Sequence, residues 1–277
     1  MPTTTHRLHF DLDDRAADRY PEIPFEVVGD SVEVTLAYDT GAAVVDLGCR
    51  DPERWRGWSG GARDRFVITP TEATPGYEPG EMPHDGWAVV LGLHAVPAEG
   101  IDVTVTVTSP AEGRVEADPP APERSDAPRG SARTLPAPEG LRWFAGDFHS
   151  HSLHSDGTAS LDQLDHRAAA NGLDFLAVTE HNTVSHHPHL PVVGERQGIL
   201  LLPGQEVTTA RGHANAFGDI GWIDFRSAAD GWDAEVEARG GLLSLNHPLE
   251  GDCSWQHPLT SLPPVLEMWH IGWFQDL

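Results

Sequence analysis

The sequence predicts an N-terminal all-β sandwich followed by an α/β domain, and three observations lead to this division. Polar and apolar residues alternate with period two up to about Thr108. A proline-rich segment then interrupts the pattern, and beyond Leu141 short apolar runs alternate with helical stretches. We therefore expect a sandwich domain at residues 1–109, a linker at residues 110–140 and the α/β domain at residues 141–277.

The first domain contains the clearest strand patterns. Ser31–Tyr38 and Ile101–Thr108 alternate strictly, as half-buried strands do, and shorter apolar runs separated by turns lie between them. About seven short strands with no convincing helix predict an antiparallel sandwich. We expect Trp55, Trp58 and Trp87 to pack in its core or between domains rather than to form a ligand platform.

The linker and the second domain differ sharply in composition. Residues 110–140 are rich in proline and charge and have almost no apolar side chains, which predicts a stiff, solvated linker. After it, helices are expected from Ser160 to Gly172 and over Ala228–Arg239, and strands over Leu173–Thr179, Gly198–Leu202, His213–Gly218, Leu242–Leu245 and Val265–Trp269. This alternation predicts parallel strand pairing with function at the carboxyl ends of the strands.

Charge and cysteine content exclude several classes of function. All 18 basic residues are Arg, and 43 acidic residues bring the net charge to −25, so we expect no nucleic-acid partner. The N-terminus lacks a signal-peptide core and no apolar run is long enough for a membrane span. Cys49 and Cys253 lie in different predicted domains, which fits a reduced, cytoplasmic setting. The oligomeric state stays open.

Residues 146–157 contain three potential metal ligands. If residues 141–151 form a strand, His149 and His151 share one face, because alternate side chains of a strand point the same way. The turn that contains Asp156 can return a carboxylate to the same space. One stretch therefore offers two imidazoles and a carboxylate, and the prediction of a metal site depends on later segments.

Later segments repeat this placement near predicted strand ends, with metal-competent side chains at His181, Glu206, His213 and His247. Imidazole and carboxylate ligands suit Zn, Mn or Fe. We therefore expect a centre for divalent metal ions. His186, His187 and His189 lie in a proline-rich loop, which favours a solvated loop or a lid, and His154 is expected to support the site or face the substrate.

These motifs carry a resemblance to a known family. The C-terminal part resembles the PHP (polymerase and histidinol phosphatase) superfamily of metal-dependent phosphoesterases, and CehA/McbA-type metallohydrolases within it are similar across nearly the whole chain. The matching stretches are His149-Ser150-His151, Ser155-Asp156-Gly157, Val178–Asn182, Gly204–Glu206, Gly212-His213 and Asn246-His247-Pro248, with Arg56–Gly60 and Ala73–Tyr77 in the first domain.

The resemblance implies a distorted (β/α)7 barrel that holds two or three divalent ions. His149 and His151 would hold one ion, and Glu206 would bridge it to a second ion. The remaining implied ligands are His213 and His247 for the second ion, and Asp156 and His181 for a third.

One departure from the family concerns the last strands. The family supplies an Asp-x-His pair there, but this sequence reaches Gln275-Asp276-Leu277 without one. We therefore expect a partial barrel, either a fragment or a natural short form. Glu267 and His270 are candidate substitute ligands, and core or edge roles for them stay equally open.

The resemblance implies a metal-dependent phosphoesterase that hydrolyses a small phosphate ester through a metal-bridging hydroxide. We expect Glu206, His181 and Arg211 to take part in catalysis. Arg211 is a candidate phosphate clamp because its guanidinium fork suits oxyanions, and an exposed surface Arg without that role is an equal alternative. One alternative is a carboxyl or carbamate ester hydrolase of the CehA/McbA type. The other is a catalytically impaired metal-binding module.

Overall fold

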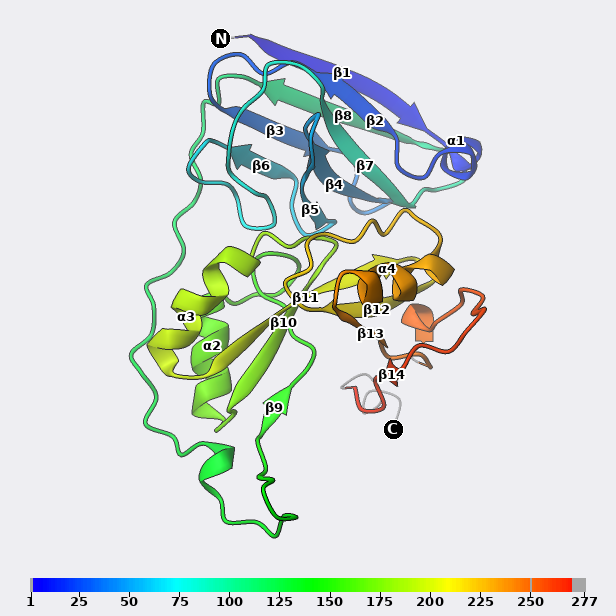
Figure 1. Cartoon of the computed structure of the whole chain (residues 1–277). Coiled ribbons are helices and arrows are strands. Elements are labelled where there is room, and N and C mark those ends of the chain that lie inside the picture. Colours follow the sequence, from blue (N-terminus) through cyan, green and yellow to red (C-terminus); the bar gives the residue numbers. More distant parts are fainter. Residues whose placement is uncertain (1, 250, 271–277) are drawn as a thin grey trace. The chain divides into compact units, whose positions relative to one another are not determined.

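The computed structural model describes residues 2–249 and 251–270. The chain divides into two compact units, residues 1–117 and residues 118–277, and each is described here by itself (Figure 1). Gln275–Leu277, the stretch named in the comparison of motifs, lie outside the described residues. Within the described ranges, none of the helices combines the length and the apolar character that a membrane crossing requires.

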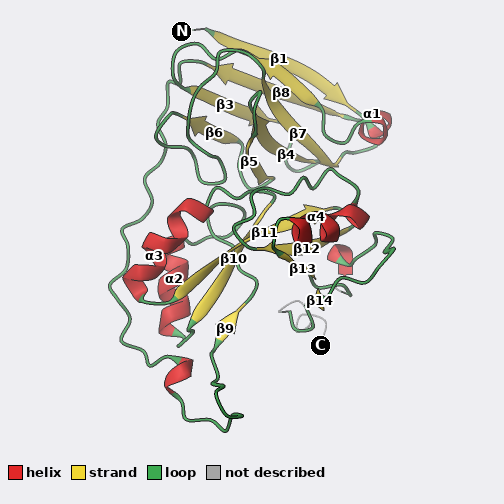
Figure 2. Ribbon diagram, in the orientation of Figure 1, coloured by secondary structure: helices red, strands yellow, loops and turns green. Residues whose placement is uncertain are grey.

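The first unit consists of two four-stranded antiparallel sheets (Figure 2). One has the order β1 (Thr3–Phe10), β8 (Ile101–Thr108), β3 (Val32–Ala37) and β6 (Arg65–Ile68). The other has the order β2 (Glu22–Phe25), β7 (Trp87–Ala95), β4 (Val44–Arg50) and β5 (Trp55–Gly60). Alternate residues of both sheets enter one shared core, as the period-two pattern predicted.

Two features of the first unit test the sequence predictions. Trp55, Trp58 and Trp87 are buried, and Trp87 belongs to the shared core of the two sheets. The expectation of no helix was wrong, because α1 (Leu12–Ala17) follows β1. Asp11 starts it by accepting hydrogen bonds from the next turn through its carboxylate, but no residue of α1 is buried, so no apolar periodicity marks it.

The second unit contains one six-stranded sheet among the described residues. Its order is β14 (Val265–Leu266), β13 (Leu242–Leu245), β12 (Gly212–Phe217), β11 (Leu200–Thr209), β10 (Phe175–His181) and β9 (Gly146–Asp147). β10 is parallel to β9 and β11, and β13 is parallel to β14. β12 is antiparallel to both of its neighbours.

The predicted all-parallel pairing was therefore wrong for β12. Only Ala210 and Arg211 connect β11 to β12, and a parallel pair needs a crossover of about a dozen residues. The described residues form a mixed sheet with few helices. They do not establish the (β/α)7 barrel that the resemblance implied.

Three α-helices accompany this sheet. α2 (Leu161–Ala170) begins at Ser160 as predicted, with a reciprocal cap between Ser160 and Gln163. α2 and α3 (Leu190–Gln197) lie side by side and bury apolar residues against β10 and β11 (Figure 2). α4 (Trp232–Ala238) packs beside β13.

The segment before β9 differs from the prediction. Residues 141–145 are not a strand, and Trp143 and Phe144 are exposed. Pairing with the sheet begins at Ala145, whose backbone bonds to Asp174, the residue before β10. Most of the predicted linker, from residue 118 on, belongs to the second unit. Arg129 donates hydrogen bonds to the carbonyls of Ala169 and Gln197, which anchors the chain beside α2 and α3.

Candidate metal centre

The carboxylate of Glu206 lies at the middle of the candidate site. Glu206 is part of β11, where the strand register places it opposite His181 of β10 and Asn215 of β12. Its side chain is 1% exposed. A buried carboxylate is stabilised only by charge partners or hydrogen-bond donors, and in this site imidazoles from four other segments supply them.

One oxygen of Glu206 faces the predicted first ion site. Its Oε2 atom lies 3.3 Å from Nε2 of His149 and 3.3 Å from Nε2 of His151, and these two nitrogens are 3.1 Å apart. Ligand atoms about 2.0–2.1 Å from one tetrahedral ion are roughly 3.3–3.4 Å apart. The three atoms therefore fit one face of a metal coordination shell.

The other oxygen faces the predicted second ion site. Oε1 lies 3.2 Å from Nδ1 of His213 and 3.3 Å from Nε2 of His247, and it accepts a hydrogen bond of 2.7 Å from the amide of Asn246. His213 stands at the start of β12 rather than at a carboxyl end, because β12 is antiparallel to β11. The hairpin thus returns this imidazole to Glu206.

The predicted third site is looser. Nε2 of His181 lies 3.6 Å from Oδ2 of Asp156, and His151 offers a further ligand atom nearby. Nδ1 of His181 faces Thr208 at 2.6 Å and Glu206 at 3.0 Å. The structure therefore brings all seven predicted ligand side chains into one region, and His181 links the first and third groups.

The charges of the site shift its proton equilibria strongly. Burial opposes ionisation of Glu206, but His181 and His149 outweigh it and hold the pKa of that carboxyl well below its usual range. Burial likewise opposes protonation of His149, and Glu206 and Glu267 overcome this and raise its pKa to about 10. Burial and the neighbouring His181 lower the pKa of His151 to about 3. Glu206 is therefore an ionised carboxylate among imidazoles whose pKa values are shifted in opposite directions.

Sequence reasoning missed Glu180, which holds the loop between His151 and Asp156 by hydrogen bonds. It is fully buried, and its oxygens accept hydrogen bonds from the hydroxyls of Ser152 and Ser155, both at 2.5 Å. Burial raises the pKa of Glu180 to about 7 despite these donors. Glu180 thereby fixes the loop that carries Asp156 against β10, and its position beside His181 was the available signal.

Other predicted residues lie apart from Glu206. Arg211 is exposed at the hairpin turn, where its guanidinium donates to the carbonyl of Gln256. His154 is buried and hydrogen-bonded to Ser185. The expectation of a solvated loop was wrong for His186, which is fully buried and donates to the carbonyl of Val178, so it braces the structure instead.

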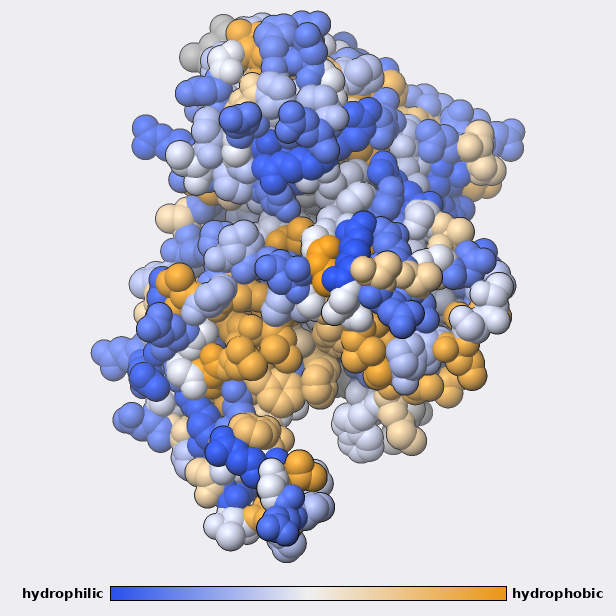
Figure 3. All heavy atoms as spheres, viewed as in Figure 1, coloured by the Kyte–Doolittle hydropathy of each residue, from blue (hydrophilic) through white to orange (hydrophobic). Residues whose placement is uncertain are grey.

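The side chains around the predicted first ion, His149, His151 and Glu206, are called the first ion group, and a large cavity adjoins this group at His149. It has a volume of ≈ 1090 Å³ and is lined on one side by His149 and Glu267. Much of the remaining lining is apolar, including Phe148, Phe217 and Met268. Figure 3 shows hydrophobic side chains gathered on the visible face of the second unit. The site therefore has polar ligands beside an apolar space that can accept a small molecule.

Comparison with known proteins gives local similarity. No protein-family model matches the chain. A stretch of 63 residues is 38% identical to a 5'-3' exoribonuclease of Haemophilus influenzae and covers 23% of each chain. A stretch of 62 residues is 37% identical to a phosphoribosyl 1,2-cyclic phosphate 1,2-diphosphodiesterase of Eggerthella lenta, covering 22% of this chain and 24% of that protein. The chain spans about a quarter of the length of the curated relatives it matches.

One solved structure is similar to this chain over less than half of the length of either chain. It is a two-domain protein from Bacteroides vulgatus described as containing a predicted PHP-like metal-dependent phosphoesterase. The two chains are 27% identical, with a TM-score of 0.36, over 45% of this chain and 40% of that one.

Proposed function

We propose that the second unit is a metal-dependent phosphoesterase of the PHP type that hydrolyses a small phosphate ester. The observation that carries this proposal is the buried Glu206, whose two oxygens face two separate groups of imidazoles at 3.0–3.3 Å. A carboxylate that faces ligands on both sides suits a bridge between two cations, which is the arrangement of two-metal hydrolases.

Bound divalent cations would supply Lewis acidity and a nucleophilic oxygen at neutral pH. His149 and His151 would hold one ion, His213 and His247 a second, and Glu206 both. Asp156 and His181 are the proposed ligands of a third ion. The buried carboxylate keeps the imidazoles in place, and the neighbouring cavity orients the ester and limits access of water. We propose Zn, Mn or Fe as the metal.

The local similarities support the phosphoesterase class in general. The two matched relatives are named for cleaving phosphodiester bonds, although the similarity covers only about a quarter of either. The CehA/McbA type is the finer proposal, and it rests on the sequence motifs alone. Arg211 stays a proposed phosphate clamp, and binding of substrate would need to draw its guanidinium from Gln256.

A small ester is favoured over a polynucleotide on two grounds. The net charge of −25 repels a polyanion, and the cavity beside the ligands has an apolar lining that suits an aryl or alkyl group. The same lining suits an aryl carbamate, so a carbamate ester hydrolase is the second candidate. A metal-binding module without turnover is the third.

One assay panel separates these candidates. The full chain, reconstituted with Mn, Zn or Fe, is offered p-nitrophenyl phosphate, a cyclic phosphodiester, a naphthyl carbamate and a short single-stranded RNA. We expect metal-dependent release of phosphate from the monoester and none from Glu206→Gln. Turnover of the carbamate alone would favour the second candidate, and near-stoichiometric metal without turnover would favour the third. Processive RNA degradation would contradict the small-ester proposal.

A further inference from the structure

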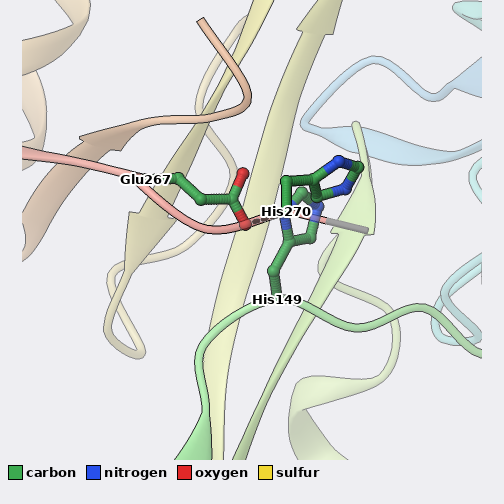
Figure 4. Close-up of side chains that lie close together, drawn as sticks. All are labelled: His149, Glu267 and His270. Atoms are coloured by element: carbon green, nitrogen blue, oxygen red, sulfur yellow. Dashed lines mark hydrogen bonds and ion pairs between the residues drawn. The ribbon is translucent and has the colours of Figure 1, made fainter. Parts of the chain in front are cut away.

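Glu267 connects to a predicted metal ligand from a distant part of the chain. It follows β14 directly, and its Oε1 atom accepts a hydrogen bond of 3.1 Å from Nδ1 of His149 (Figure 4). The other ring nitrogen, Nε2 of His149, faces Glu206 and His151. Glu267 therefore binds Nδ1 of His149, the ring nitrogen that does not face the first ion group.

The second oxygen of Glu267 reaches the other ion group. Oε2 accepts a hydrogen bond of 2.8 Å from the backbone N–H of His247. His247 has a φ of 27°, a left-handed conformation that is costly for a residue with a side chain and needs support from its surroundings. The backbone N–H of Glu267 donates to the carbonyl of Leu245 at 2.7 Å, which fixes Glu267 relative to β13.

The geometry distinguishes two roles for Glu267. Ligand atoms of His149, Glu267 and His270 lie close enough to surround an ion, and Figure 4 shows the three side chains together. Such an ion would need Nδ1 of His149, which already donates to Glu267, while Nε2 is directed to the first ion group. A ligating histidine commonly gives its second N–H to a carboxylate, which fixes the tautomer and the ring orientation.

We propose that Glu267 is a positioning residue that holds His149 by its side chain and His247 by its backbone, and so sets the geometry of both ion groups at once. The inference rests on the proposed metal centre but needs no particular substrate. Because His149 and His247 face different oxygens of Glu206, loss of Glu267 lowers the binding affinity for both ions rather than for one. Substituting a residue that ligated only one ion would lower the affinity for that ion more than the affinity for the other.

The test compares Glu267→Ala and Glu267→Gln with the exposed Glu195 on α3 changed to the same residues. Affinity for Zn or Mn is measured by chelator competition, and the metal content by elemental analysis. Removing an outer carboxylate typically lowers metal affinity by about 10–100-fold. We expect a loss of that size for Glu267→Ala at both ions, a smaller loss for Glu267→Gln, and none for the Glu195 variants.

A spectroscopic readout separates positioning from general damage. In the metal-loaded wild type, the ¹⁵N shifts of His149 should show a protonated Nδ1 and a metal-bound Nε2, and Glu267→Gln should perturb the Nδ1 signal while the chain stays folded. Unchanged affinity in folded Glu267→Ala would overturn the proposal. Equal loss of a single ion from Glu267→Ala and His270→Ala would overturn it in favour of direct ligation. Neither readout requires turnover, so failure of the proposed activity remains a separate result.

Discussion

At the scale of single residues, Glu206 is the side chain on which the predicted ligands converge. Seven side chains from five segments were expected at a metal centre, and the structure brings them together around this one carboxylate or its partner His181. The sequence contains this information because each ligand type is chemically distinctive and stands near a strand. It does not contain the partner of His149, since nothing local links Glu267 to a residue 118 positions away.

Glu206→Gln is the most informative single substitution. The amide keeps the shape of the side chain but removes the charge that faces both imidazole groups. We expect the affinity for both ions to fall by more than roughly 100-fold relative to wild type, which exceeds the loss expected for an outer carboxylate. Hydrolysis should fall to background. Isothermal titration with Zn or Mn measures the first effect, with Glu195→Gln as the isosteric control. A variant that still bound two ions tightly would contradict the bridging role.

At the scale of elements, the sequence predicted the bounds of α2, β10, β12 and β13 to within two residues, but not the antiparallel pairing of β12. It predicted β9 and β11 poorly. β11 was expected to end at Leu202, because Pro203 and Gly204 commonly interrupt strands. The strand continues because Gly204 leaves room for Thr179, whose methyl carbon would lie 2.9 Å from an added Cβ. This tertiary contact is invisible in the sequence, and it carries Glu206 into the sheet and allows the hairpin with β12.

Within α2, Asp165 provides a pH-dependent test of stability. Its carboxylate is fully buried without a hydrogen-bond partner among the described residues, and burial, with Asp162 nearby, raises its pKa to about 7. The folded protein therefore binds a proton that the unfolded chain releases near the ordinary pKa of 3.8. The penalty is absent below about pH 4, grows as the pH rises to about 7, and is complete above it.

Asp165→Asn removes this penalty. We expect the variant to be more stable than wild type by roughly 2–4 kcal/mol at pH 8 and to lose that advantage near pH 4. Urea unfolding of the full chain at several pH values measures the difference, with the exposed Asp230→Asn as the control. A change in the free energy of unfolding that did not vary with pH would show that the pKa of Asp165 is the same in the folded and unfolded states, and would contradict this prediction.

At the scale of the whole molecule, the two units differ in what holds them together. The first unit buries a continuous apolar core between two sheets. The second has edge strands of only two residues, β9 and β14, and the segments beside them carry His149 and Glu267. Local patterns predicted each unit's class, but not that polar contacts between distant segments would join the edges of the second sheet.

This difference predicts where bound metal acts. Ions that bind only the folded state stabilise it by about 2.7 kcal/mol at a concentration of 100 Kd, and here they would join residues of β10, β11, β12 and the loops after β9 and β13. Hydrogen–deuterium exchange with Zn or Mn, and again after chelation, should therefore show metal-dependent protection within residues 146–156, 178–182, 204–215 and 244–248 and unchanged exchange in β1–β8. Glu206→Gln should lose this protection. Metal-dependent protection spread equally over both units, or retained in that variant, would contradict a centre organised by Glu206.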